Sequence, residues 1–149
     1  MSIPYDVFTN AFLSKVTEYE FINMDSFDRN SIMDEYMKHA ISSFERINKY
    51  KFANTGDDKV REFNIDIAPE DLDEIVDIIS EGMLVYWMKP YIYKQEVLEN
   101  ILNTRDYTTY SPAELLMRLR NAYSQADIDF KHMMRAYSYA HGDLTDLHL

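Results

Sequence analysis

Apolar side chains recur every three or four residues along most of this chain, and few helix-breaking residues interrupt them. The 149 residues include only 3 glycines and 4 prolines, which leaves few turns and favours long helices over many short strands. The same spacing gives each helix one apolar face that can join a shared core. The sequence therefore predicts an all-α fold in one domain, since a chain of this length has the commonest domain size.

The first half of the chain predicts two helices and an irregular segment. Pro4 suits the first position of a helix, and the apolar spacing continues to about residue 16 or 19. A second helix is expected from about residue 26 or 28 to residue 48. An acidic loop or extended arm near 50–68 follows, and its "EFNIDI" (62–67) alternates apolar and polar residues, which fits a short strand or an extended arm.

The second half predicts two or three further helices, giving a four- to five-helix bundle. Pro69 begins one helix, and Pro90 should end or kink it at about Lys89, because proline lacks the backbone N–H and crowds the preceding turn. Helical spacing resumes over 91–102. The final helix starts at "SPAE", where Ser111 caps, proline takes the first position and glutamate completes a capping box.

Charge is distributed unevenly along the chain. The net charge is −11, and residues 57–81 alone contain ten acids and two bases, a balance of −8. Residues 112–141 have a balance of +1. This polarity suits a molecule that meets different partners at its two ends, or copies of itself. It argues against a classical DNA-binding protein, which neutralises phosphates with a basic stripe.

Few residues suggest catalysis or cofactor binding. The chain has no cysteine and no glycine-rich phosphate loop, and the absence of cysteine fits a reducing compartment. Asp73, Asp77 and Glu81 share a helix face, which is more typical of a solvated surface than of acid–base chemistry. Asp129 and His132 form only half of a di-iron motif, which needs ligands from other helices. We expect a protein that is not an enzyme and binds no cofactor or metal.

Membrane insertion and secretion are not expected either. The longest uninterrupted apolar run, Met83 to Met88, has six residues, whereas a membrane span needs about 20. The start "MSIPYDVF" has neither the basic nor the apolar region of a signal peptide. These features predict a soluble intracellular protein.

The aromatic segment "VYWMKPYIY" has two interpretations. It contains Tyr86, Trp87, Tyr91 and Tyr93 around a proline. Bulky core packing is one interpretation, and it is favoured for Trp87. The run is apolar on both sides of the helix, however, so part of it is a candidate interface with a neighbouring molecule.

The C-terminal segment 142–149 is predicted to be an extended docking tail beyond a helical domain of residues 1–141. A metal site made by its histidines and aspartates would lack supporting side chains. Burying its three leucines would contribute about 5–9 kcal/mol, while ordering its residues costs roughly 1–2 kcal/mol each. One tail is therefore near break-even, but many copies would bind through multivalency. The proposed docking residues are Leu144, Leu147, His148 and Leu149.

Two segments resemble head–tail connector (adaptor) proteins of tailed bacteriophages. They are "SEGMLVYWMKPYIYKQEVLENILNTRDYTTYSPAELLMRL" (Ser80 to Leu119) and "YSYAHGDLTDLHL" at the end. The resemblance implies a small helical bundle that assembles, typically as twelve copies, into a ring under the portal protein. Such a ring extends the DNA channel and offers a surface to a tail-side neck or tail-completion protein. It implies no cofactor, no active site and no membrane, and a location in the neck of the virion after assembly in the host cytoplasm.

The acidic segment has a possible use in such a channel. Like charge would keep the passing DNA duplex from sticking, and the candidate channel acids are Asp57, Asp58, Glu62 and Asp66. An alternative function uses the same charge differently: an acidic helical inhibitor could imitate DNA and occupy a nucleic-acid-binding protein. A true mimic should spread its acids over one long surface, whereas here they are concentrated in one stretch.

Overall fold

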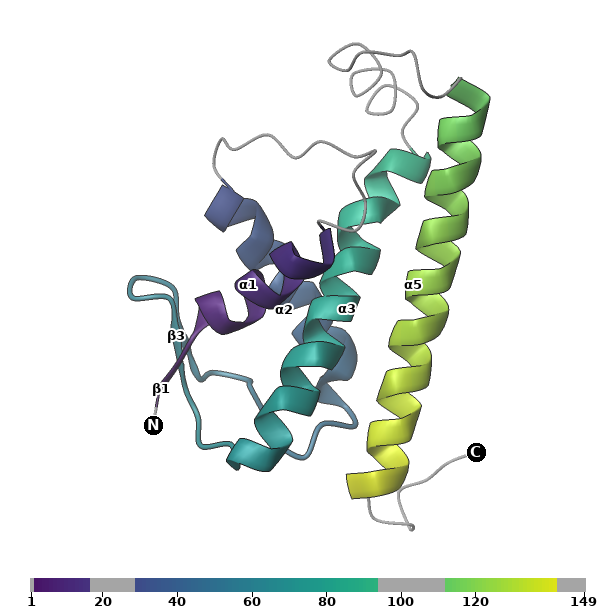
Figure 1. The fold of residues 1–149 in the computed structure, drawn as a ribbon. Coiled ribbons are helices and arrows are strands. Elements are labelled where there is room, and N and C mark those ends of the chain that lie inside the picture. Colours follow the sequence, from purple (N-terminus) through teal and green to yellow (C-terminus); the bar gives the residue numbers. More distant parts are fainter. Residues whose placement is uncertain (1, 17–28, 94–111, 142–149) are drawn as a thin grey trace.

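A computed structural model describes residues 2–16, 29–93 and 112–141 (Figure 1). Four helices and three short strands make up this part of the chain. In order they are β1 (Ser2–Pro4), α1 (Tyr5–Val16), α2 (Arg29–Glu45), β2 (Gly56–Asp57), β3 (Glu62–Asn64), α3 (Pro69–Tyr93) and α5 (Pro112–His141).

Helix α3 is the centre of the fold, because α1, α2 and α5 all pack against it. Its face of Ile75, Ile79 and Met83 is fully buried, as expected for apolar residues at three- and four-residue spacing. Helices α2 and α5 approach α3 closely at Gly82. A Cβ atom there would lie 2.8 Å from the Ala40 Cβ of α2 and 2.7 Å from the Phe130 ring of α5, so only glycine allows this close approach.

A small antiparallel sheet with the strand order β1-β3-β2 lies beside the start of α1 (Figure 1). Ile3 of β1 pairs with Phe63 of β3, and Gly56 of β2 pairs with Phe63 from the other side. Ile3 and Phe63 are both buried. The predominance of helix was predicted, but the all-α description is wrong in this detail. The strands have only two or three residues each, too few to give a clear period of two, and "EFN" is the part of 62–67 that is a strand.

Pro69 and Pro112 begin helices as predicted, but Pro4 does not begin one and Pro90 does not end one. Pro4 is the last residue of β1, and the first helix begins one residue later at Tyr5, whose N–H donates to the Arg61 carbonyl at 2.9 Å. Pro90 does not end α3, which continues to Tyr93. A proline forfeits one backbone hydrogen bond at such a position, and the buried Trp87 and Met88 just before it anchor that turn of helix in the core.

Other helix boundaries lie closer to those predicted from the sequence. Helix α1 ends at Val16 and α5 begins at Pro112 and runs to His141. Helix α2 ends at Glu45, three residues earlier than predicted, because a turn follows in which the N–H groups of Ile47 and Asn48 both donate to the Phe44 carbonyl. Most of the helix predicted for 91–102 lies outside the described residues.

Candidate functional site

Helix α5 has a buried apolar stripe on one face and three separate exposed apolar residues on the opposite face. Figure 1 shows it along one side of α3, with α1, α2 and the strands on the other side. The inward stripe is buried and consists of Leu119, Ala126, Phe130 and Tyr137. On the opposite face, Met117, Ile128 and Tyr139 are 65%, 58% and 58% exposed. They are eleven residues apart, close to three turns of 3.6 residues, so they share one face. We call these three residues the outer stripe.

The outer stripe is bordered by positive charge. The exposed charged residues of α5 from Met117 onward are all basic: Arg118, Arg120, Lys131 and Arg135. The two acids in this part of the helix, Asp127 and Asp129, are half-buried, and each accepts a hydrogen bond from another residue of α5. Asp127 accepts a hydrogen bond from Lys131 at 2.9 Å, and Asp129 accepts one from Gln125 at 2.8 Å. The Asp127 carboxylate also raises the pKa of Lys131, which keeps this cation charged.

Most exposed carboxylates lie on the other elements, although Glu114 is exposed in the first turn of α5. They are found on α1, on α2, on the hairpin formed by β2 and β3, on the segment after it and on α3. The set comprises Asp6, Glu35, Asp57, Asp58, Asp66, Glu70, Asp73, Glu74 and Asp77. The same elements and the loops between them also expose cations, which are Lys38, Arg46, Lys49, Lys51, Lys59 and Lys89.

A cavity of about 370 Å³ lies between α2 and the β2–β3 hairpin. Cavities of this size can accept part of a ligand or a few side chains. Its lining combines buried apolar rings with a polar rim. The lining residues are Tyr5, Lys38, Ile41, Ser42, Glu45, Phe52, Ala53, Asn54, Gly56, Asp58 and Phe63. We call it the α2–hairpin cavity.

One side of this cavity is organised by Asp58. The Tyr5 hydroxyl donates to Asp58 Oδ1 at 2.8 Å, and Lys38 Nζ donates to Asp58 Oδ2 at 3.0 Å. The Tyr5 hydrogen bond is the main cause that lowers the pKa of Asp58, and Lys38 adds to it. Burial, together with the same carboxylate, raises the pKa of Tyr5. Asp58 is thus kept ionised with one cation beside it.

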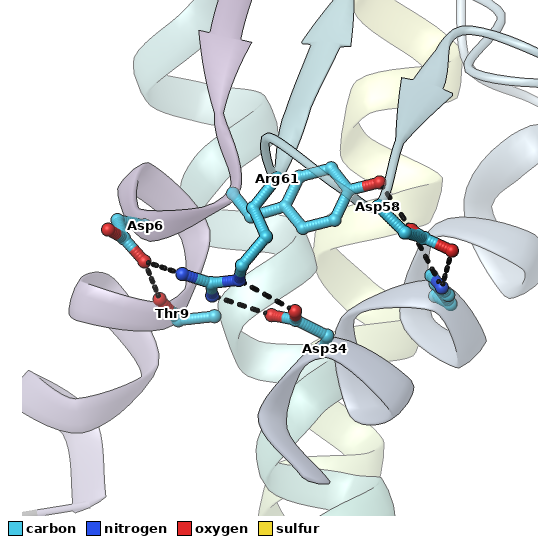
Figure 2. A network of polar contacts seen from close by, with 7 residues as sticks. Asp6, Thr9, Asp34, Asp58 and Arg61 are labelled. Carbon is cyan, nitrogen blue, oxygen red and sulfur yellow. Dashed lines mark hydrogen bonds and ion pairs between the residues drawn. The ribbon is translucent and has the colours of Figure 1, made fainter. Parts of the chain in front are cut away.

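Arg61 fastens the hairpin to two helices (Figure 2). Its Nε and Nη2 atoms each lie 2.8 Å from an oxygen of Asp34 in α2, and Nη1 lies 2.8 Å from Asp6 Oδ1 in α1. These carboxylates, Asp34 first, raise the pKa of the guanidinium. Arg61 has a φ of 55°, a left-handed conformation that non-glycine residues rarely adopt. The positive charge of Arg61 therefore stabilises the packing of the hairpin against α1 and α2.

The four candidate channel acids lie on or just after the hairpin. Asp57 and Glu62 are directly opposite each other in the β2–β3 register, and Asp58 follows Asp57 in the turn. Asp66 lies in the extended segment that leads to α3. Asp57, Asp58 and Asp66 are exposed and Glu62 is half-buried. The structure therefore brings three of the four together, although Lys38 offsets the charge of Asp58.

The aromatic segment divides between core and surface. Trp87 is 1% exposed, and its ring meets Phe12 edge-on at 5.8 Å between centroids. It belongs to the core rather than to an exposed interface, because it lies on the inward face of α3. Tyr86 is half-buried, with its hydroxyl 2.6 Å from Ser43 Oγ and its ring stacked on His39. Tyr91 and Tyr93 are in the last turn of α3.

Two of the three acids weighed for catalysis, Asp77 and Glu81, make contacts between helices. Lys15 of α1 lies 2.7 Å from Asp77 Oδ1 and 2.9 Å from Glu81 Oε2, which ties α1 to α3. Within the described residues, no three histidine or acidic side chains are grouped to hold a metal ion. None of the helices described has the length and apolar character needed to cross a membrane.

The outer stripe is the feature that the sequence analysis missed. Its signal was the eleven-residue spacing of Met117, Ile128 and Tyr139, which the denser core pattern of the same helix concealed. The tail residues Leu144, Leu147, His148 and Leu149 lie outside the described part of the chain. Comparison with known proteins found no matching family model, no matching curated protein and no matching solved structure.

Proposed function

We propose that this chain is a structural subunit of a larger assembly, and specifically a head–tail connector of a tailed phage. The observation that carries the proposal is the outer stripe. Exposed apolar residues scattered singly are ordinary, but three in register on one helix face, with cations beside them, suit a protein–protein contact.

In this function, several copies form a ring under the portal protein, with twelve as the number that the resemblance implies. Asp57 and Glu62, paired across the hairpin, are the best-placed acids to repel DNA passing through the ring. Asp58 contributes less, because Lys38 lies 3.0 Å from it. The tail leucines and His148 attach the ring to the portal, and a tail-side protein binds the opposite end.

The decisive experiment is quantitative mass spectrometry of purified phage particles from the source organism. A copy number near that of the portal and far below that of the capsid protein supports a connector. Absence from the particles contradicts it. Deletion of residues 143–149 should abolish attachment of the chain to the portal in these particles. Far-UV circular dichroism of the purified variant should show unchanged helicity. Retained attachment contradicts the docking role of the tail.

The DNA-mimic alternative has weaker support. A mimic needs its carboxylates free to replace phosphates, yet Lys15 pairs with two acids, Arg61 with two and Lys38 with one. Competition by the purified chain for a protein bound to duplex DNA would favour this alternative over a connector.

A further inference from the structure

We propose that His141 is a proton-sensitive latch that holds the last turn of α5 against the first two turns of α3. The imidazole Nε2 lies 3.1 Å from Glu74 Oε1, and Nδ1 lies 4.0 Å from Asp71 Oδ1. The latch is closed when both ring nitrogens carry hydrogen, and it opens when one hydrogen is lost. This inference concerns the single chain and does not depend on the connector function.

The positions of the two carboxylates favour the charged ring over the neutral one. A neutral imidazole has one N–H and one lone pair, whereas the imidazolium has two N–H groups. If Nε2 of a neutral ring donates to Glu74, the ring nitrogen nearest Asp71 has only a lone pair. If Nδ1 carries the hydrogen instead, the Nε2 lone pair lies 3.1 Å from the Glu74 oxygen. Only the imidazolium is attracted to both acids at once.

Asp71 has the greater need of a positive partner. Its side chain is 12% exposed, compared with 46% for Glu74. Asp71 Oδ2 accepts a hydrogen bond from the Tyr50 hydroxyl at 2.6 Å, but that donor is neutral. Among the described residues, His141 is the only basic side chain within 4.0 Å of Asp71. Because a poorly solvated carboxylate is costly without a cation, protonation of His141 completes this site.

The other polar groups of the cluster do not change charge near neutral pH. The hydrogen bond to Asp71 raises the pKa of Tyr50, and burial raises the pKa of Tyr137, whose ring lies 4.4 Å from the imidazole. Lys49 Nζ lies over the Tyr50 ring, 5.5 Å from its centre. Histidine is the side chain that ordinarily changes charge between about pH 5 and 8, so it is the member of this cluster that responds to pH in that range.

The N-terminus of α3 does not replace the latch. A helix dipole favours a carboxylate in the first turn, and Asp71 occupies that turn. This stabilisation is the same whether His141 is charged or neutral, however, so it creates no dependence on the histidine. The pH dependence comes from the contact between the two helices.

An open latch loosens the end of α5 and leaves the rest of the fold in place. Phe130 and Tyr137 stay buried in the core, whereas Tyr139 and Ala140 beyond them are exposed. His141 therefore makes the contact that ties the final turn to α3, and helix ends held by few contacts open easily. Residues 142–149 follow directly in the sequence, so the latch determines whether their starting point is held on the body of the protein.

Hydrogen exchange of the amides of residues 138–141 in the full-length chain measures the latch. His141→Gln keeps a hydrogen-bonding side chain that cannot become charged. At pH 5.5, we expect these amides to exchange about two- to fivefold faster in His141→Gln than in the wild type, the size typical of a partly exposed ion pair. At pH 8.5 the two rates should be nearly equal. Comparing both proteins at one pH removes the intrinsic effect of pH on exchange.

Three further variants separate charge from other effects. His132→Gln is the matched control, because His132 is exposed on the same helix, and it should exchange like the wild type at both pH values. His141→Lys has a cation at both pH values, so its last turn should stay protected at pH 8.5. Glu74→Gln combined with Asp71→Asn should remove the pH-dependent difference between histidine and glutamine at position 141. Far-UV circular dichroism confirms that every variant is folded.

The contrary results are equally specific. If His141→Gln speeds exchange by the same factor at pH 5.5 and 8.5, the imidazole holds the last turn by packing on Tyr137, and the latch is overturned. Equal exchange in His141→Gln and the wild type at both pH values overturns it as well. A pH-dependent difference that survives the removal of both acids places the responsible charge elsewhere and also overturns the proposal.

Discussion

Arg61 and Asp34 make a two-point contact, in which the guanidinium Nε and Nη2 atoms each lie 2.8 Å from one carboxylate oxygen. The pair joins the turn of the acidic hairpin to α2, and its side chains are only 24% and 15% exposed. Two parallel charge-assisted hydrogen bonds fix orientation as well as distance. This contact therefore holds the hairpin against the helices despite the concentration of negative charge there.

Arg61→Lys should lower the free energy of unfolding by about 1–2 kcal/mol, because lysine cannot reproduce the planar fork that holds Asp34 and Asp6 together. Both side chains face the same backbone strain at a φ of 55°, so the substitution isolates the side-chain contact. Urea denaturation measures the loss. The control Lys131→Gln removes an exposed pair on α5 and should cost less than about 0.5 kcal/mol. Equal losses in the two variants would contradict a special role for Arg61.

Gly82→Ala should destabilise the protein even though alanine is the better helix former. Helix propensity favours alanine by about 1 kcal/mol, but the new methyl group would meet the Ala40 Cβ at 2.8 Å. Overpacking of this kind costs typically 1–3 kcal/mol, and the Phe130 ring would have to move as well. Thermal unfolding followed by circular dichroism should show a lower midpoint. Adding Ala40→Gly should recover part of the loss, and no recovery would contradict the proposed clash.

Alkaline pH should weaken the fold through Tyr5. Burial and the Asp58 carboxylate raise the pKa of Tyr5 above its ordinary value of about 10. A group whose pKa is higher in the folded state contributes stability that is fully present below its unfolded pKa and lost above it. We therefore expect the stability advantage of the wild type over Tyr5→Phe to shrink as the pH rises above about 10. Denaturant titrations of both proteins across that range provide the measurement, and a constant difference would contradict it.

Elements that local signals determine were predictable from the sequence, whereas elements that depend on contacts between distant residues were not. The starts of α3 and α5 followed from a local signal, a proline at the first helical position. Strand β1 did not, because Ile3 is extended only through its pairing with Phe63, sixty residues away. The contacts of Arg61 with Asp6 and Asp34 likewise depend on the turn conformation at residue 61, which no sequence pattern announces.

The sequence predicted only part of the candidate surfaces. The uneven distribution of charge along the chain was visible in the sequence. The cavity was not visible, because its lining comes from Tyr5, from α2 and from the hairpin, which only the tertiary fold brings together. Outward and inward residues of α5 could be separated only after the position of α3 fixed which stripe was buried.

Tyr137 anchors the end of α5 to the segment that follows α2. Its hydroxyl donates to the side-chain oxygen of Asn48 at 3.1 Å and accepts from the Lys49 N–H at 3.1 Å. Asn48 is 2% exposed, and its Nδ2 atom has no hydrogen-bond partner within the described part of the chain. The Tyr137 hydroxyl is therefore important for satisfying the polar groups buried at this junction.

Tyr137→Phe should lower the free energy of unfolding by about 1–3 kcal/mol, since it leaves Lys49 N–H and Asn48 without their shared partner in a buried site. The ring and its contact with Phe44, 4.8 Å between centroids, should survive, so helicity should be unchanged. Tyr139→Phe is the matched control two residues away: its side chain is exposed, and its removal should cost less than about 0.5 kcal/mol. Hydrogen exchange should then show faster opening of the last turns of α5 in Tyr137→Phe alone. Equal exchange in both variants would mean that the inward apolar stripe, rather than the hydroxyl, holds this end of α5 in place.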